Sequence, residues 1–230
     1  MKLIGLVGGM TWESTLEYYR IMNESVKEKL GEFHSARCLL YSFDFAPIAK
    51  LQEKRKWKKL TKLMETAAQT LERSGAELIV ICANTMHIMA DEIQNYISIP
   101  ILNIIDVTAE EVLKNGLSSV GLLGTIFTME EDFYKKRLSE KYGIDVIIPS
   151  KVGRKVINSI IYRELSLGII KNSSKEKYIE IINDLLSRNA EGIILGCTEI
   201  PLLIKKEDVN APIFDTTSIH AKAAVGYALK

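Results

Sequence analysis

Short apolar runs alternate along the chain with longer stretches in which apolar residues recur at helical spacing. The runs have four to seven residues and are rich in Ile, Val and Leu, as at 78–81 and 192–195. Such an alternation of buried strands with helices is typical of βαβ units, in which helices cover both faces of a parallel sheet. The pattern therefore predicts an α/β fold.

The bounds of these elements follow from the apolar spacing and from capping residues. Strands are predicted at 3–7, 38–43, 78–81, 101–105, 120–123, 145–148, 192–195 and 213–214. Helices are predicted from Thr11 or Ser14 to Leu30, at 60–74, 85–97, 106–115, 130–142, 153–165 and 174–189, and from Ser218 onward. In the first helix, one face is shared by Leu16, Tyr19, Asn23, Val26 and Leu30.

One segment of the sequence occurs twice. Residues 76–83 (Ala-Glu-Leu-Ile-Val-Ile-Cys-Ala) match residues 190–197 (Ala-Glu-Gly-Ile-Ile-Leu-Gly-Cys), which lie 114 positions later. The chain therefore contains two copies of one α/β unit, and a site shared between two facing halves is expected. The expected first lobe comprises 1–100 plus 208–230, and the second comprises 101–207.

Polar turns follow the buried strands at four places. They are residues 8–11, 83–85, 124–125 and 197–199. In open parallel sheets, ligands bind at the carboxyl ends of the strands, and free N–H groups at the start of a helix favour a carboxylate there. Side-chain donors are added by Asn84, Thr85, Thr125 and Thr198. These positions could also be ordinary helix caps, but their arrangement in two mirrored pairs favours a binding site.

Cys197 is the best catalytic candidate among the residues of these turns. It ends a buried strand and precedes a helix start, an environment expected to lower the thiol pKa and to supply a base or nucleophile. The alternative is a small buried core residue, which is the preferred interpretation of Cys38. His87 lies one turn into a helix and could bond a neighbouring strand end. Cys82 and His87 alone are too few ligands for a zinc site, so no metal is expected.

Composition narrows the function classes. The chain has 230 residues, 47% of them hydrophobic, and a formal net charge of +1, with no basic run interleaved with aromatics. A nucleic-acid partner therefore has no electrostatic support. No apolar run approaches the ~18 residues of a membrane span, and three cysteines without C-x-x-C spacing fit reduced thiols. We expect a cytoplasmic protein. Gly8-Gly9 lacks the G-x-G-x-x-G spacing of a dinucleotide site.

Four motifs together resemble the aspartate/glutamate racemase family over essentially the whole chain. They are Gly-Leu-Val-Gly-Gly-Met-Thr-Trp-Glu-Ser-Thr (5–15), Asn-Thr-Met-His (84–87), Gly-Cys-Thr-Glu-Ile (196–200) and Phe-Asp-Thr-Thr-Ser-Ile-His-Ala (214–221). The resemblance implies two pseudo-symmetric lobes, each a four-stranded parallel sheet flanked by helices, with the active site between the lobes. It implies a cofactor-independent amino-acid racemase, an isomerase that needs no pyridoxal phosphate, acting on a small amino-acid substrate and usually dimeric. The family's substrate contacts correspond to Met10, Gln52, Asn84, Thr85, Thr125 and Thr198.

Position 83 departs from the family pattern. The resemblance places the first acid/base immediately before Asn84-Thr85, commonly as Cys and in some members as Thr, whereas this chain has Ala83. The internal repeat sets Ala83 opposite Cys197 as well. Because neighbouring side chains of a strand point to opposite faces, Cys82 should point away from the site unless the strand has already broken into a turn. Cys197 is therefore expected to serve one face of the substrate, and either Cys82 or a bound water the other.

The sequence alone does not determine which amino acid is the substrate. Aspartate-selective relatives have Arg and Lys at the positions of Ile48 and Ser166, so the chain is more similar to the broader-specificity racemases. Two other functions remain. One is a lyase, such as a decarboxylase, that uses Cys197 as its single thiol. The other is a catalytically silent paralogue that binds carboxylates.

Overall fold

The computed structural model describes residues 1–230, which form two compact units. Unit 1 comprises Met1–Ile104 and His220–Lys230, and unit 2 comprises Ile105–Ile219. The expected boundaries, which assigned 208–230 to the first lobe, were wrong. Strand β8 (Ile213–Asp215) pairs with β7 (Gly192–Gly196) in the sheet of unit 2, so the chain returns to unit 1 only within helix α11 (Thr216–Ala228).

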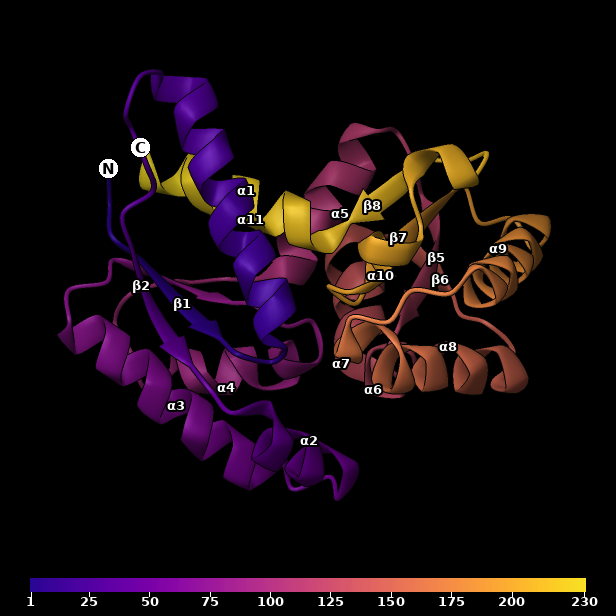
Figure 1. Ribbon diagram of the computed structural model, residues 1–230, viewed down its shortest axis with the longest axis horizontal. Coiled ribbons are helices and arrows are strands. Elements are labelled where there is room, and N and C mark those ends of the chain that lie inside the picture. Colours follow the sequence, from indigo (N-terminus) through magenta and orange to yellow (C-terminus); the bar gives the residue numbers. More distant parts are fainter. The chain divides into compact units, whose positions relative to one another are not determined.

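Each unit contains one four-stranded parallel sheet (Figure 1). Unit 1 has the order β2-β1-β3-β4, and unit 2 has the same order, β6-β5-β7-β8. The remaining strands are β1 (Ile4–Gly8), β2 (Cys38–Ser42), β3 (Leu78–Ile81), β4 (Ile101–Leu102), β5 (Ser119–Gly124) and β6 (Asp145–Ile147). The identical orders confirm the predicted duplication and the predicted α/β fold class.

The helices follow the predicted alternation with some changes of length. Unit 1 contains α1 (Trp12–Leu30), α2 (Phe45–Glu53), α3 (Trp57–Arg73), the 3₁₀ helix η1 (Thr85–Met89), α4 (Ala90–Gln94) and the first residue of α5 (Ile104–Lys114). Unit 2 contains α6 (Ile126–Glu130), α7 (Asp132–Lys136), the π-helix η2 (Arg137–Lys141), α8 (Lys151–Arg163), η3 (Leu165–Leu167), α9 (Asn172–Ser187), α10 (Ile200–Leu203) and η4 (Lys206–Asp208). Helix α2 was not predicted, and the predicted helices 85–97 and 130–142 are broken into short pieces.

Helix α1 begins after Thr11 and ends at Leu30, as predicted. The Thr11 hydroxyl accepts a hydrogen bond from the Ser14 N–H at 3.4 Å, and Gly31 follows the last turn with φ 76°. The face that includes Leu16 and Tyr19 is largely exposed, since these two side chains are 54% and 53% accessible. The buried face instead includes Tyr18, and Val26 is the only member of the predicted set that is buried.

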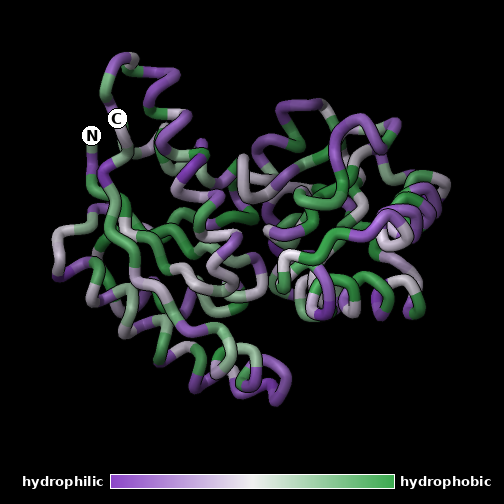
Figure 2. The backbone as a smooth tube through the Cα atoms, in the orientation of Figure 1, coloured by the Kyte–Doolittle hydropathy of each residue, from purple (hydrophilic) through white to green (hydrophobic).

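Both faces of the unit 1 sheet are covered. Ile79 and Ile81 of β3 pack with α3 and α4, whereas Leu78 and Val80 pack with α1 and α11. This alternation is the period of two that a strand imposes on its side chains. In Figure 2 hydrophobic residues predominate along the inner segments of each unit, and the helices alternate between hydrophobic and hydrophilic residues.

The sheet of unit 2 packs in the same way against helices α8 and α9. Ile193 and Leu195 of β7 share one apolar cluster with Ile157 of α8 and with Tyr178 of α9. Cys197, just beyond β7, belongs to the same cluster. The cluster fixes the direction in which β7 presents the residues that follow it.

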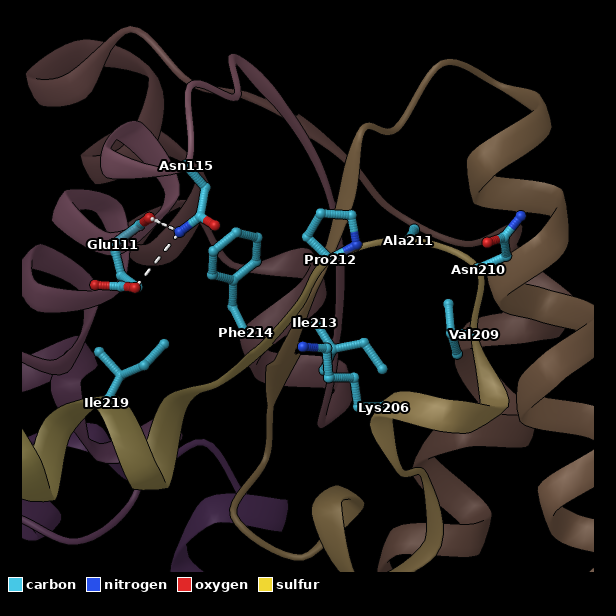
Figure 3. A pocket seen from close by; sticks show the side chains of 10 residues that line it. All are labelled: Glu111, Asn115, Lys206, Val209, Asn210, Ala211, Pro212, Ile213, Phe214 and Ile219. Carbon is cyan, nitrogen blue, oxygen red and sulfur yellow. Dashed lines mark hydrogen bonds between the residues drawn. The ribbon is translucent and has the colours of Figure 1, made fainter.

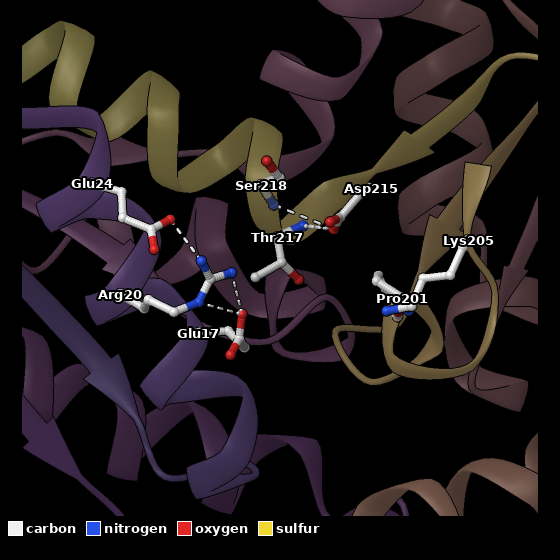
Figure 4. Close-up of polar contacts among 8 residues, drawn as sticks. All are labelled: Glu17, Arg20, Glu24, Pro201, Lys205, Asp215, Thr217 and Ser218. Carbon is white, nitrogen blue, oxygen red and sulfur yellow. Dashed lines mark hydrogen bonds and ion pairs between the residues drawn. The ribbon is translucent and has the colours of Figure 1, made fainter. Parts of the chain in front are cut away.

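Figure 4 shows a side-chain cap at the start of α11 and ion pairs along α1. The Asp215 carboxylate accepts hydrogen bonds from the N–H groups of Thr217 at 3.0 Å and Ser218 at 3.2 Å, at the start of α11. Arg20 on α1 forms exposed ion pairs with Glu17 and Glu24, which contribute little to stability. None of the helices combines the length and the apolar composition that crossing a membrane requires.

Candidate active site

Ala83 and Cys197 occupy equivalent places after their strands. Ala83 belongs to the apolar cluster of Ile79 and Ile81, and Cys197 belongs to the cluster of Ile193 and Leu195. Each residue therefore shares a sheet face with the alternate residues of the strand that precedes it. The packing agrees with the pairing of positions 83 and 197 that the sequence repeat indicates.

Cys82 faces the opposite side of the unit 1 sheet. Its side chain is fully buried in the cluster of Leu78 and Val80, and its N–H donates to the Val7 carbonyl at 2.9 Å. Burial, with a smaller contribution from Cys38, raises the pKa of the Cys82 thiol. The strand alternation thus extends to residue 82, and the thiol lies in the core rather than beside Ala83.

Cys197 is paired with a buried carboxylate. Its Sγ–H donates to Glu199 Oε2 at 2.9 Å, and the Thr198 hydroxyl donates to the same oxygen at 3.0 Å. Glu199 is only 4% exposed. Glu199 was not among the predicted site residues, although it lies in the same polar turn, two residues after the thiol.

The pKa of the Cys197 thiol is raised well above its usual value. Burial is the main cause, and the negative charge of Glu199 is the next. The backbone N–H groups of Thr198 and Glu199 lower the pKa, as the position before a helix predicts, but they are outweighed. The expected lowering was therefore wrong, and the protonated thiol is the stable form.

The two polar turns of unit 2, at residues 124–125 and 197–199, lie side by side because their strands are in register. Gly124 of β5 pairs with Gly196 of β7, so Thr125 and Cys197 follow adjacent strand ends. A Cβ atom on Gly124 would approach the Gly196 carbonyl oxygen to 2.7 Å. Glycine thus permits this close approach. The Thr125 hydroxyl caps α6 by accepting from the Thr128 N–H at 3.2 Å.

Unit 1 brings its predicted contact residues to the corresponding edge. Strands β1 and β3 pair with Val7 opposite Ile81, so the turn of residues 8–11 and the turn of residues 83–85 are neighbours. Gln52 contacts helix η1, which begins in the second of these turns. Its Nε2 donates to the Met86 sulfur at 3.1 Å. The predicted contacts of this unit are all buried, and they are Met10, Gln52, Asn84 and Thr85.

Two buried histidines lie behind the Ala83 turn. His87 Nδ1–H donates to the Ala83 carbonyl at 2.9 Å, and His87 Nε2 accepts from the Ile104 N–H at 3.2 Å. His220 Nε2–H donates to the Leu102 carbonyl at 2.8 Å, and its Nδ1 accepts from the Tyr18 hydroxyl at 2.8 Å. A carbonyl can only accept and a backbone N–H can only donate, so the two partners of His87 assign it an uncharged ring with the proton on Nδ1. In His220 the Leu102 carbonyl requires a proton on Nε2, and the lowered pKa of the ring leaves Nδ1 as the acceptor of the Tyr18 hydroxyl.

We expect His220 to make the protein sensitive to acid. Burial, followed by the nearby His87, lowers the pKa of His220 to about 3, while the unfolded chain titrates at about 6.5. Below the unfolded value only the unfolded state binds the proton, so this group's contribution to stability is present above about pH 6.5 and falls by up to ~1.4 kcal/mol per pH unit toward the folded pKa.

His220→Gln should remove this dependence. Between about pH 8 and pH 5, the difference in unfolding free energy between the parent and His220→Gln should shrink by about 2 kcal/mol. Urea denaturation at several pH values measures it, with the exposed His34→Gln as the matched control. A difference that is independent of pH would contradict the assigned tautomer and burial.

Two surface grooves are lined by other residues. One, in unit 2, has a volume of about 590 Å³ and is lined by residues that include Glu111, Asn115, Lys206 and Phe214 (Figure 3). The other, in unit 1, has a volume of about 430 Å³ and is lined by residues that include Trp12, Tyr19 and Leu40. Neither groove contains a predicted site residue. The structure places no three His, Cys, Asp or Glu side chains together as a metal site.

Comparison with known proteins gives one family. The model of the Asp/Glu/Hydantoin racemase family matches residues 7–224. A crystal structure of a candidate Asp/Glu racemase from Yersinia pestis is 50% identical with a TM-score of 0.93, and an aspartate racemase homologue from Pyrococcus horikoshii is 41% identical with a TM-score of 0.87, each over 100% of both chains.

A curated relative is more distant. The broad specificity amino-acid racemase of Bacillus subtilis is 26% identical over 72% of this chain and 71% of its own length. Glutamate racemases also match, and the chain spans about half of their length. The structural matches confirm the two parallel four-stranded sheets as the fold of Asp/Glu racemases. The chain therefore belongs to the Asp/Glu/Hydantoin racemase family, a family of isomerases, as its motifs predicted.

Proposed function

We propose that this protein is a cofactor-independent amino-acid racemase in which Cys197 is the acid/base for one face of the α-carbon. The observation that carries the proposal is the Cys197–Glu199 pair, a buried thiol 2.9 Å from a buried carboxylate at the end of β7. The racemases to which the chain is similar support the reaction class. The polar turns with Asn84, Thr85, Thr125 and Thr198 are proposed to bind the amino-acid substrate.

The pair can move a proton in either direction. When Cys197 gives its proton to Glu199, the thiolate can remove the α-hydrogen, and the electron pair of the broken C–H bond stays on the substrate as an enediolate. In the reverse direction the Cys197 thiol delivers a proton to that carbon, and Glu199 restores the thiol. A base that acts near neutral pH needs such a neighbour here, because burial and charge raise the pKa of the thiol.

The opposite face of the substrate is proposed to rely on a bound water. The internal repeat assigns that face to position 83, where the methyl group of Ala83 offers no proton. Cys82 was the alternative donor. Its full burial in the core on the other face of the sheet supports the water instead.

The substrate is proposed to be an acidic amino acid or one of a broader set. Ile48 is 2% exposed and packs in the core of unit 1, so this position supplies no cation for a side-chain carboxylate. The similarity to the Bacillus subtilis enzyme with broad specificity supports the wider set.

A lyase that uses a single thiol is the second candidate function. Ala83 favours it, because a decarboxylation needs only one proton, delivered to the enediolate by Cys197. A carboxylate binder without turnover is the third possibility that the same turns permit.

Chiral chromatography separates these functions. The protein is incubated without pyridoxal phosphate with L- and D-aspartate, L- and D-glutamate, neutral amino acids and α-substituted malonates. Formation of the opposite enantiomer from any amino acid supports the racemase. Loss of carbon dioxide from a malonate without inversion of an amino acid would favour the lyase, and no conversion of any compound would favour the binder.

We expect Glu199→Gln to make the Cys197 thiol more reactive toward alkylation and to make racemisation slower. Without the carboxylate charge, the pKa of Cys197 should fall toward its usual value, because that charge is the second largest cause of the rise. Alkylation of Cys197 by iodoacetamide should therefore occur at lower pH. The racemisation rate should fall by about 10²- to 10⁴-fold, since the proton acceptor is lost.

Mass spectrometry of the peptide with Cys197 measures the alkylation. Glu191→Gln is the matched control, because Glu191 accepts from the backbone N–H groups of Ser118 and Ser119 rather than from the thiol. An alkylation profile that does not change in Glu199→Gln would refute the coupling between the two groups.

We propose a homodimer as the assembly. Exposed apolar side chains on α1 and on the edge strand β2, namely Trp12, Leu16, Tyr19 and Leu40, form a face that a second copy would cover. Sedimentation velocity should give twice the mass of 25.9 kDa. Leu16→Glu with Tyr19→Glu should shift the protein toward monomer, and a parent that sediments as a monomer would refute the dimer.

A further inference from the structure

The turn that contains Ala83 is held by a side chain where a backbone bond would be usual. In an α-helix, the N–H of residue 87 would donate to the carbonyl of residue 83. Here the His87 N–H donates to the Asn84 carbonyl at 3.0 Å, in the 3₁₀ pattern of η1. The Ala83 carbonyl instead accepts from His87 Nδ1–H at 2.9 Å.

The other nitrogen of the same ring binds the chain where it leaves unit 1. His87 Nε2 accepts from the N–H of Ile104, which is the last residue of the first segment of unit 1. A single imidazole therefore links the Ala83 turn to the start of helix α5. It is 4% exposed.

The second histidine lies where the chain re-enters unit 1. His220 is the first residue of the returning segment, and its ring centroid lies 5.6 Å from that of His87 in an edge-to-face arrangement. It donates to the Leu102 carbonyl and accepts from the Tyr18 hydroxyl, whose residue is fully buried on α1. The two rings thus hold both the segment where the chain leaves unit 1 and the segment where it returns. Both segments are bound close to the Ala83 turn.

We propose that His87 is a positioning residue, which sets the orientation of the Ala83–Thr85 turn through its bond to the Ala83 carbonyl, with His220 and Tyr18 as its support. The consequence for the reaction rests on the proposed function. Rotation of the Ala83 carbonyl changes the direction of the Ala83 side chain and of the Asn84 and Thr85 donors that follow. A displacement of ~1 Å in such groups can reduce a rate by about 10²-fold.

Two substitutions of His87 separate its two bonds. In His87→Asn the amide can donate from near the Nδ1 position, so the bond to Ala83 is retained and that to Ile104 is lost. In His87→Gln the longer side chain reaches the Nε2 position, so the carbonyl oxygen can accept from Ile104 while the bond to Ala83 is lost. A purely structural role would make the two variants equivalent.

Hydrogen exchange followed by mass spectrometry tests the positioning without any substrate. His87→Gln should increase exchange about 10-fold or more in the peptide that covers residues 83–88, with little change at residues 192–200, whereas His87→Asn should remain close to the parent. Equal exchange at residues 83–88 in both variants would overturn the proposal. If His87→Gln loosens the whole chain, Tyr18→Phe, which removes the hydroxyl that supports His220, should give a smaller increase confined to unit 1 peptides. An increase that is not confined in that way would also overturn it.

Steady-state kinetics tests the consequence for the reaction. With the best substrate, His87→Gln should lower kcat by about 10- to 100-fold with a smaller change in KM, and His87→Asn should keep kcat within about threefold of the parent. A kcat that is equal in the two variants would contradict the role in turnover. If the parent converts no amino acid, the proposed function fails, while the exchange experiment still decides whether His87 positions the turn.

Discussion

Ala83→Cys is expected to raise the racemisation rate by about 10²- to 10⁴-fold, which is the usual contribution of a general acid or base. Position 83 follows β3 as Cys197 follows β7, and each residue shares a face with the alternate residues of its strand. A thiol at position 83 should therefore supply the proton donor that the methyl group does not. The gain should occur in both directions, because in the proposed mechanism each thiol would serve one enantiomer.

Cys82→Ala is the matched control for this prediction. Because Cys82 is fully buried on the other face of the sheet, its replacement should cost stability but change the rate little. A coupled chiral assay measures both variants. An inactive Cys82→Ala together with an Ala83→Cys no faster than the parent would show that Cys82 reaches the substrate after all.

Cys197→Ser is expected to abolish exchange of the substrate α-hydrogen. A serine hydroxyl has a much higher pKa than a thiol and cannot act as the base near neutral pH, even beside Glu199. Proton NMR of the substrate in deuterated water follows the loss of the α-hydrogen signal, with circular dichroism as the check on folding.

Cys38→Ser provides the comparison for Cys197→Ser. Cys38 lies on the edge strand β2, and the internal repeat does not align it with a site position. The Cys38→Ser variant should exchange the α-hydrogen at a rate within about twofold of the parent, since substitutions away from the core and from the site usually have small effects. Exchange that continues at the parent rate in Cys197→Ser would remove Cys197 from the mechanism.

Much of the fold was predictable because successive side chains of a strand point to opposite faces of the sheet. Alternation of side chains along β3 and the internal repeat were sufficient to place Cys82 in the core and Ala83 on the face of Ile81. The capping residues Thr11 and Gly31 located the first helix for the same local reason. These features depend on near neighbours in the sequence.

Other features depend on contacts between residues that are distant in the sequence. The first helix buries Tyr18 rather than Leu16 because α11, which lies near the other end of the chain, packs on that face together with β1. Strand β8 belongs to unit 2 because its backbone pairs with β7. Neither the local apolar pattern of α1 nor the position of β8 in the sequence indicates these partners.

The raised pKa of the Cys197 thiol could not be predicted from the sequence either. The position before a helix predicts a lowered pKa, and the backbone N–H groups do act in that direction. How deeply the thiol is buried and where the Glu199 carboxylate points reverse the sign. A polar residue two positions from a candidate nucleophile was a signal that could have identified Glu199.

Deuterium incorporation by the unmodified protein tests the central claim most directly. The protein is incubated with each enantiomer of the best substrate in deuterated water, and the product and the recovered substrate are analysed at low conversion. Removal of the proton from one face and its return to the other predicts deuterium at the α-carbon of the inverted product. Deuterium that enters the recovered substrate with retention, without any inverted product, would contradict the racemase and leave Cys197 as the only acid/base of the site.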